Sequence, residues 1–144
     1  MDDFDIQDFL PYLLNQAAEA TSQEFNRYYR DHYGLLRTDW RVLFHLGQFG
    51  AMTATEIGRR ASIHKTKISR AAQRLAEKRL ILRQTVPGDK RSEVLSLSAK
   101  GQQVFGDLHQ KAQSYDAKLL ASLSPNEQTV LRQSLRRIAG LEAA

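Results

Sequence analysis

Residues 53–98 read TATEIGRRASIHKTKISRAAQRLAEKRLILRQTVPGDKRSEVLSLS, and the order of local patterns in this stretch decides the fold. Thr53–Glu56 has the form of a capping box, which predicts a short helix through Arg60. Ser62 and Ile63 follow as a turn, and a second helix is expected from His64 to Lys78. A hairpin comes next, so the stretch has the order of a winged helix-turn-helix: support helix, recognition helix and wing.

The second helix has two unlike faces. Its apolar face is expected to pack inward and carries Ile68, Ala71, Ala72 and Leu75. Its polar face supplies donors and short hydroxyls near the helix start, from Lys65, Thr66, Lys67, Ser69 and Arg70. Such side chains can read base edges in the major groove, and a helix N-terminus favours phosphate, which His64 could also contact. An isolated helix of this kind would be interpreted as a solvated surface, but the neighbouring elements favour DNA contact.

The periodicity then changes from helix to strand. Short strands are predicted at Leu80–Leu82 and Val94–Leu97, around a turn from Val86 to Ser92. Arg91 at the tip would enter the minor groove, and Asp89 would accept a hydrogen bond from Arg91 and hold the hairpin in shape. A turn-forming aspartate after glycine is also compatible with the position of Asp89. We expect Lys90 and Arg83 near phosphates.

Positive charge is concentrated in the same region. Residues 59–91 hold eleven Lys or Arg against Glu77 and Asp89, a net charge of +9, so the rest of the chain carries −4 of the total +5. This separation indicates a surface that meets a polyanion, for which double-stranded DNA is the first candidate. Thr53 and Thr55 could add phosphate contacts from the first helix, although capping alone is a sufficient role for Thr53.

Helical patterns flank the basic region on both sides. A helix is predicted from Pro11 to about Asp31 with Gly34 as its cap, and another begins at a Thr38 cap and ends at Gly47 and Gly50. After the wing, Ser98 caps a long helix and Ser124–Glu127 starts a last one. Their apolar stripes must be buried somewhere, and a helical dimerisation region is the economical arrangement.

Composition excludes several classes of protein. The 144 residues contain no Cys, which rules out disulfides, thiolate metal sites and a cysteine peroxide sensor. No apolar run approaches the roughly 20 residues that span a bilayer, and the acidic N-terminus is unlike a secretory signal, so we expect a cytoplasmic protein. The four histidines, His32, His45, His64 and His109, lack the spacing of a metal site, and no metal or cofactor is expected.

Several motifs together resemble the MarR family of bacterial transcription regulators. Trp40–Leu43 resembles the family's entry to its second helix, and Ile63–Arg70 resembles the start of its recognition helix. Leu75–Arg83 is similar to the passage into the wing, and Pro87–Ser92 with Leu95–Gly101 is similar to the wing and the start of the long helix. The family often has Gly where Arg79 stands, so the chain is expected to carry backbone strain at Arg79 or to bend differently there.

The resemblance implies a mainly α-helical homodimer with a small β-hairpin wing. Residues 1–36 and 99–144 would form the dimerisation region, and residues 37–98 the winged helix-turn-helix. Many members release DNA when a small phenolic or other aromatic ligand binds. Trp40, Arg41 and His45 are candidates for such a pocket on that basis only, while core packing is the alternative for the aromatic residues nearby.

The leading interpretation is a sequence-specific DNA-binding regulator, expected to be a repressor, that binds a pseudo-palindromic operator. The alternative is a basic architectural protein that coats DNA without sequence preference; it shares the charge but needs neither the wing motif nor the hydroxyl-rich helix. An enzyme is not expected, because the chain has no Gly-rich phosphate loop, nucleophile motif or metal spacing.

Overall fold

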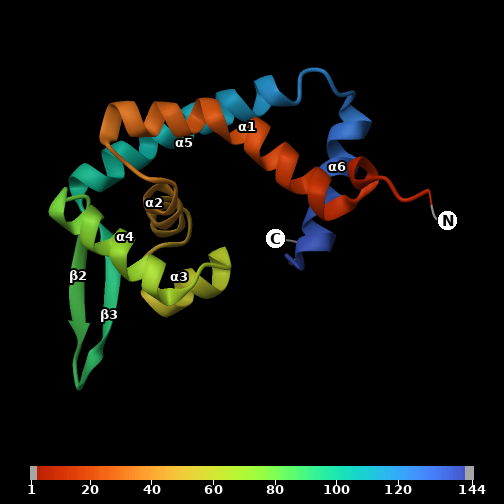
Figure 1. Ribbon diagram of the computed structural model, residues 1–144. Coiled ribbons are helices and arrows are strands. Elements are labelled where there is room, and N and C mark those ends of the chain that lie inside the picture. Colours follow the sequence, from red (N-terminus) through yellow and green to blue (C-terminus); the bar gives the residue numbers. More distant parts are fainter. Residues whose placement is uncertain (1–2, 142–144) are drawn as a thin grey trace. The chain divides into compact units, whose positions relative to one another are not determined.

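The computed structural model describes residues 3–141, without the side chains of Lys90 and Arg91. Contacts divide the chain into two units, Met1–Lys111 and Ala112–Ala144, which we describe separately. The elements are α1 (Leu10–Tyr33), α2 (Arg37–Phe49), β1 (Met52–Thr53), α3 (Ala54–Ala61), α4 (Lys65–Glu77), β2 (Ile81–Val86), β3 (Asp89–Leu97), α5 (Ala99–Leu119) and α6 (Pro125–Ala139), after a 3₁₀ turn at Ile6–Asp8 (Figure 1). The predicted fold class, mainly helical with a small wing, is confirmed.

The start of α2 differs from the prediction, and of the two glycines predicted to end it only Gly50 is its C-cap. Gly34 ends α1 as expected, with φ +64° and its amide donating to the Arg30 carbonyl at 2.8 Å. Thr38 lies inside α2 and does not cap it; the N-cap residue is Leu36, whose amide donates to Asp39 Oδ2 at 2.9 Å. Gly47 lies within the helix and does not end it. A Cβ there would lie 2.4 Å from the Phe105 ring, so this glycine allows α5 to approach α2.

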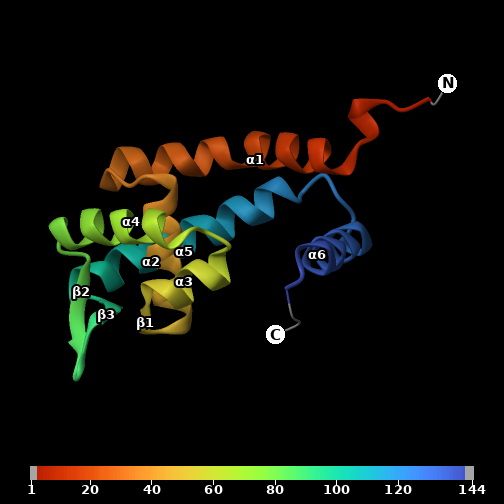
Figure 2. The same ribbon diagram turned by 60° about the horizontal axis from the view of Figure 1, so that its bottom comes forward.

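The sheet is larger than the sequence predicted. The two wing strands extend to a turn of only Pro87 and Gly88, where Gly88 has φ +84°, so the expected turn from Val86 to Ser92 was too long. A further short strand, β1, was not predicted; it pairs antiparallel with β3 and gives the order β1-β3-β2. Figures 1 and 2 show the β2–β3 hairpin extending away from the helices. Cross-strand pairing therefore continues to the tip and makes the wing a long arm.

The junction between α4, the wing and α5 is tightly built. Arg79 has φ +60°, which confirms the expected strained backbone where the chain leaves α4. Ser98 caps α5 as predicted, since its Oγ accepts from the Gly101 amide at 3.0 Å, and it also donates to the Arg79 carbonyl at 2.7 Å. A Cβ on Gly101 would lie 1.9 Å from the Leu80 carbonyl oxygen. The base of the wing and the start of α5 are thus in direct backbone contact.

The core of the first unit lies around α2 and α4. The inward face predicted for α4 is confirmed, because Ile68, Ala71, Ala72 and Leu75 are all at most 2% exposed. The neighbouring α2 contributes the buried Val42, Leu43 and Leu46. Ile81 and Leu95 of the sheet are also buried, as is Leu80 just before β2. Aromatic residues gather between α1 and α2: the Trp40 ring centroid lies 5.3 Å from that of Phe25 and 5.1 Å from that of Phe44.

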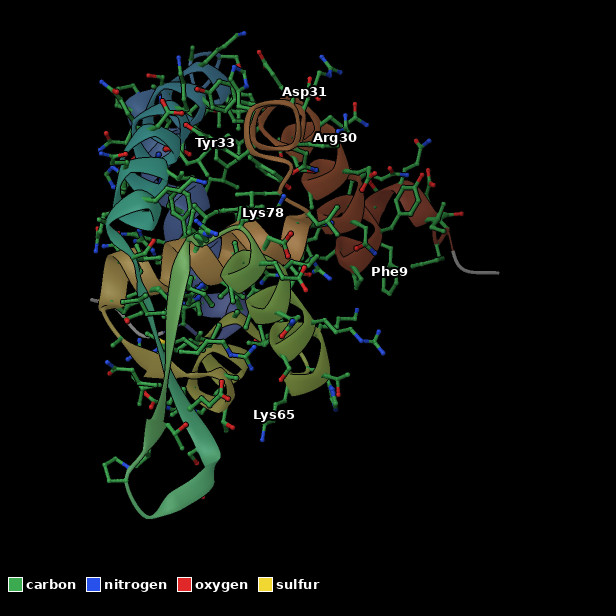
Figure 3. The ribbon with its side chains drawn as sticks, turned by 90° about the vertical axis from the view of Figure 1, so that its left-hand side faces the viewer. Phe9, Arg30, Asp31, Tyr33, Lys65 and Lys78 are labelled. Atoms are coloured by element: carbon green, nitrogen blue, oxygen red, sulfur yellow. The ribbon has the colours of Figure 1, made fainter. Side chains whose placement is uncertain are left out.

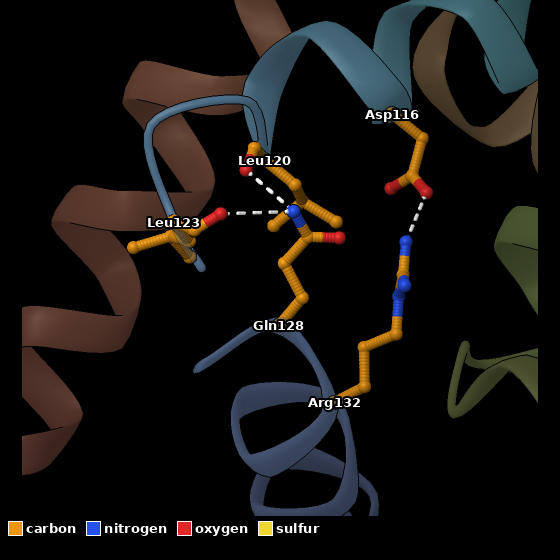
Figure 4. A network of polar contacts seen from close by, with 5 residues as sticks. All are labelled: Asp116, Leu120, Leu123, Gln128 and Arg132. Atoms are coloured by element: carbon orange, nitrogen blue, oxygen red, sulfur yellow. Dashed lines mark hydrogen bonds and ion pairs between the residues drawn. The ribbon is translucent and has the colours of Figure 1, made fainter. Parts of the chain in front are cut away.

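The second unit joins the end of α5 to α6. The predicted capping box is confirmed, with Glu127 N donating to Ser124 Oγ at 3.1 Å and Ser124 N donating to Glu127 Oε1 at 2.9 Å. Figure 4 shows Gln128 Nε2 donating to the carbonyls of Leu120 at 2.9 Å and Leu123 at 3.1 Å, beside an ion pair of Arg132 and Asp116. These bonds fix the turn into α6. None of the described residues after Lys111 is buried.

Candidate nucleic-acid interface

The helix-turn-helix is held by backbone contacts that require specific residues. Thr53 caps α3 as predicted, since its Oγ1 accepts from the Glu56 amide at 3.2 Å. Ser62 turns the chain with φ +56°, and the Ile63 amide donates to the Gly58 carbonyl at 2.9 Å. A Cβ on Gly58 would lie 2.7 Å from the Ile63 carbonyl oxygen. The glycine therefore permits the close approach on which the turn depends.

The N-terminus of α4 is open to solvent. His64 caps this helix, because its Nδ1 accepts from the Thr66 amide at 3.1 Å. With Nδ1 an acceptor, the neutral ring carries its proton on Nε2, which leaves that N–H free to donate outward. All the predicted recognition residues of α4 are exposed: Lys65, Thr66, Lys67, Ser69 and Arg70. Figure 3 shows Lys65 pointing away from the body of the unit on the side where the hairpin extends.

A groove of about 430 Å³ lies between α3, α4 and the wing. Five of the predicted site residues line it: Thr53, Thr55, Lys65, Ser69 and Arg83. The remaining recognition residues, His64, Thr66, Lys67 and Arg70, are exposed but do not line the groove. The groove also contains Ser92 and Glu93 of β3, which the sequence analysis did not single out. Support helix, recognition helix and wing thus share one polar surface.

Two wing residues have partners of their own. Arg83 Nε donates to Glu93 Oε2 at 2.7 Å, and Arg83 Nη1 donates to Gln73 Oε1 of α4 at 2.8 Å. Asp89 Oδ2 accepts from Ser92 Oγ at 2.9 Å, which supports a role in shaping the hairpin. The side chains of Lys90 and Arg91 lie outside the described residues, so the expected bond from Arg91 to Asp89 stays a prediction.

The three residues suggested for an effector pocket lie on α2 and have structural partners. Arg41 Nη2 donates to the Ala61 carbonyl at the end of α3 at 2.7 Å, and burial lowers the pKa of this guanidinium. His45 Nδ1 lies 2.6 Å from the Arg41 carbonyl oxygen. Trp40 belongs to the aromatic core between α1 and α2. Arg41 therefore connects α2 to α3 and Trp40 connects α2 to α1, whereas the contact of His45 lies within α2.

A polar cluster joins α1 to α5 close to this region. The hydroxyls of Tyr28 and Tyr33 both donate to Asp107 Oδ2, at 2.8 and 2.5 Å. These two bonds lower the pKa of Asp107, that from Tyr33 most. Burial, followed by the bond to the carboxylate, raises the pKa of Tyr33 to about 12. The sequence analysis missed Asp107, whose partners lie 79 and 74 positions earlier in the chain.

The described residues, 3–141, lack the features of two other classes of protein. They contain no cluster of three or more His, Asp or Glu side chains arranged to hold a metal ion. None of the helices in the same range combines the length and the apolar character needed to cross a bilayer.

The comparisons with known proteins agree with this architecture. Residues 33–92 match the MarR family. The chain is 24% identical over 127 residues to the uncharacterised HTH-type transcriptional regulator YwoH of Bacillus subtilis, covering 88% of this chain and 91% of that protein. It is 28% identical to a probable transcriptional regulator from Pseudomonas aeruginosa, with a TM-score of 0.76 and coverage of 93% and 99%. Bordetella bronchiseptica BpsR, a protein whose DNA binding is regulated by 6-hydroxynicotinic acid, shares the fold at 18% identity, with a TM-score of 0.86 and coverage of 98% and 100%.

Proposed function

We propose that this chain, which belongs to the MarR family of DNA-binding transcriptional regulators, is a repressor that binds a pseudo-palindromic operator as a homodimer. Its relatives are named as HTH-type regulators, and it is a regulator of that class rather than an enzyme. The observation that carries the proposal is the shared polar surface of α3, α4 and the wing, together with the net charge of +9 on residues 59–91. The proposal needs no cofactor or metal, and it places the protein with bacterial chromosomal DNA in the cytoplasm.

In this proposal α4 enters the major groove with its exposed first turns. Lys65, Lys67 and Arg70 donate to guanine edges or phosphates, and Thr66 and Ser69 supply hydroxyls. His64 Nε2 donates to a phosphate at the helix N-terminus, where the backbone dipole also favours the anion. Thr53 and Thr55 face the same groove from the start of α3. Arg91 reads the narrow minor groove from the tip of the wing, and Lys90 follows the phosphates.

The homodimer is supported by apolar side chains that the chain leaves exposed near both ends. In the first unit they are Phe4, Ile6, Phe9, Leu10 and Leu13, which are 43–69% exposed. In the second unit they are Val130, Leu131, Leu135, Ile138 and Leu141, which are 39–58% exposed. Apolar side chains at such density on helices need a partner surface. Residues 1–36 and 99–144 accordingly form the dimerisation region, and residues 37–98 the DNA-binding region.

We also propose release from DNA by a small aromatic acid. BpsR provides a precedent for regulation by 6-hydroxynicotinic acid within this fold. The guanidinium of Arg41 is the suitable cation for a carboxylate, with Trp40 and His45 beside it on α2. Because Arg41 binds the Ala61 carbonyl at the end of α3, an anion on Arg41 would loosen the support helix. A panel of aromatic acids that neither raises the melting temperature nor weakens DNA binding would remove this part of the proposal.

Selection of random DNA fragments on the purified protein at physiological salt, followed by sequencing, tests the main proposal. We expect an enriched inverted repeat with half-site centres about 10 base pairs apart. Retention of DNA without any enriched motif would instead identify an architectural protein, since nonspecific binding is driven almost entirely by phosphates. Repression is tested separately, by transcription from a promoter that contains the selected site with and without the protein.

A further inference from the structure

A three-residue bridge joins the wing to the recognition helix. Arg83 on β2 donates through Nε to Glu93 on β3 at 2.7 Å and through Nη1 to Gln73 on α4 at 2.8 Å. Gln73 is held in turn, because its Nε2 donates to Glu77 Oε1 at 3.1 Å. The guanidinium therefore uses two of its nitrogens to connect two strands with a helix.

Strand register explains why these side chains meet. Arg83 pairs with Leu95 and Thr85 pairs with Glu93, so Arg83 and Glu93 are diagonal neighbours on one face of the sheet. The same face carries Leu95 and Ile81, which are buried against the helices. On α4, Gln73 lies one turn after Ser69, a residue of the groove. The bridge is therefore built at the inner side of the groove.

Glu93 is an acidic residue in a surface that is proposed to bind DNA. It lines the groove together with Lys65, Thr55 and Ser69, and its side chain is 39% exposed. A free carboxylate there would repel phosphates and weaken binding. Glu93 instead forms an ion pair with Arg83, so its negative charge has a partner within the protein. An ion pair exposed to this degree adds little to global stability, so its effect must be sought in the geometry of the wing.

The proposed DNA contacts require that geometry to be fixed. The recognition helix and the wing tip would occupy adjacent grooves, so the angle between α4 and the hairpin decides whether both can bind at once. A two-stranded hairpin is only marginally stable alone and needs packing against another element. The bridge supplies a polar anchor for the wing at Arg83, well before its tip at Pro87 and Gly88.

We propose that Arg83, Glu93 and Gln73 are positioning residues that set the wing at its DNA-binding angle, and that Glu93 thereby strengthens DNA binding despite its negative charge. This inference rests on the proposed function. It separates Arg83 from the phosphate-contacting cations, because both of its bonded nitrogens serve partners within the protein. Lysine could keep the charge of Arg83 but not the two-pronged geometry.

The test separates the effect of the charges of Arg83 and Glu93 on DNA binding from the effect of their hydrogen-bond geometry. Operator affinity is measured by fluorescence anisotropy over a series of salt concentrations for Arg83→Lys, Glu93→Gln, the double variant and Gln73→Ala, with Lys65→Ala as a control for a phosphate contact. We expect Arg83→Lys and Glu93→Gln each to weaken binding about tenfold, which is the effect of one charge-assisted hydrogen bond. The double variant should be no weaker than either single one. The salt slope should stay unchanged in Arg83→Lys, whereas Lys65→Ala should lower it by about 0.9.

Two DNA-binding results would overturn the bridge. One is Glu93→Gln binding as tightly as the wild type or more tightly, and the other is Arg83→Lys binding normally, as expected of a simple phosphate contact. Amide hydrogen exchange of residues 81–97 gives a readout without DNA, and it should become faster in both variants while the melting temperature stays within a few degrees of the wild type. If the wild type shows no sequence preference, the proposed function fails, but the bridge can still be tested without DNA. Unchanged amide exchange of residues 81–97 in the variants would refute the bridge, and faster exchange would support it.

Discussion

The carboxylate of Asp39 and the guanidinium of Arg74 join the first turn of α2 to the last turn of α4. Arg74 Nη2 lies 2.7 Å and Nε 2.9 Å from Asp39 Oδ1, and Asp39 is completely buried. Its other oxygen accepts the Leu36 amide at the start of α2. One carboxylate thus caps a helix and holds the recognition helix. Arg74 is the one basic residue of α4 whose described contacts lie within the protein core.

Asp39→Asn should lower the free energy of unfolding by about 3 kcal/mol, because it leaves the half-buried Arg74 without its counter-charge and weakens the cap. Urea denaturation measures the loss. Asp31→Asn is the matched control, since Asp31 pairs with Arg30 at 3.8 Å on an exposed surface and should change stability by less than about 0.5 kcal/mol. Equal effects of the two substitutions would contradict the role given to the buried pair.

Gly101→Ala should destabilise the protein by about 3 kcal/mol, because the new Cβ would meet the Leu80 carbonyl at 1.9 Å and the backbone there must move. Gly106 lies in the same helix with nothing within 4 Å of its Cβ position. Gly106→Ala should therefore be neutral or stabilise by up to about 1 kcal/mol through helix propensity. Thermal unfolding of the pair separates the two cases. A Gly101→Ala protein as stable as Gly106→Ala would refute the close contact between α5 and the base of the wing.

Tyr33→Phe should lower stability by about 1 kcal/mol at pH 7 through loss of the bond to Asp107. It should also change the pH dependence. The pKa of Tyr33 is raised to about 12, so its contribution is complete below about pH 10 and is lost as pH rises toward 12. The pKa of Asp107 is lowered, so its contribution is present above the ordinary value of 3.8 and is lost as pH falls through the native value.

Urea midpoints measured from acid to alkaline pH test this linkage. In Tyr33→Phe the loss of stability between pH 10 and 12 should shrink. The loss at acid pH should become smaller because one donor to Asp107 is gone, but it should not disappear, since Tyr28 remains as the second donor. Tyr12→Phe on α1 is the control, because no hydrogen bond involves the Tyr12 hydroxyl in the described part of the chain. A wild-type profile that is flat above pH 10 would show that Tyr33 does not carry this linkage.

Arg91→Ala should abolish tight operator binding while the dimer stays folded, because the guanidinium at the wing tip is assigned to the minor groove. Binding by anisotropy and the dimer mass by light scattering are the two measurements. Arg27→Ala, which removes the same charge from an exposed position on α1, should leave affinity within about twofold, since a distant surface charge is screened by salt. Unchanged affinity of Arg91→Ala would refute the assignment of the wing.

Local sequence patterns were sufficient to predict those features in which the interacting residues are close together in the chain. The caps at Thr53, Ser98 and Ser124, the left-handed end at Gly34 and the inward face of α4 all involve residues within one or two helical turns. The same holds for the strain at Arg79, which was expected from a side chain in a position that favours glycine. The distribution of Lys and Arg along the sequence predicted the basic surface, because this distribution can be read without knowledge of any tertiary contact.

Partnerships across long stretches of chain could not be predicted in this way. Gly47 resembles a helix end until Phe105 of α5 occupies the space beside it, and Asp39 resembles an ordinary first-turn acid until Arg74 of α4 reaches it. Thr38 was predicted as the cap from local preference alone, although the buried carboxylate of Asp39 accepts the hydrogen bond from the Leu36 amide. In each case packing between distant elements outweighed a local preference of about 1 kcal/mol.

By itself, the sequence determined that this protein is helical with a basic wing, where most of its helices begin, and which side chains of α4 are available to a polyanion, because these properties depend on periodicity, capping and charge. Only the tertiary structure decided that Glu93 and Gln73 share Arg83, that Asp39 anchors α4, and that two tyrosines of α1 meet Asp107. The physical reason is that hydrogen bonds and ion pairs between distant residues depend on strand register and helix packing, which are set only when the whole unit folds.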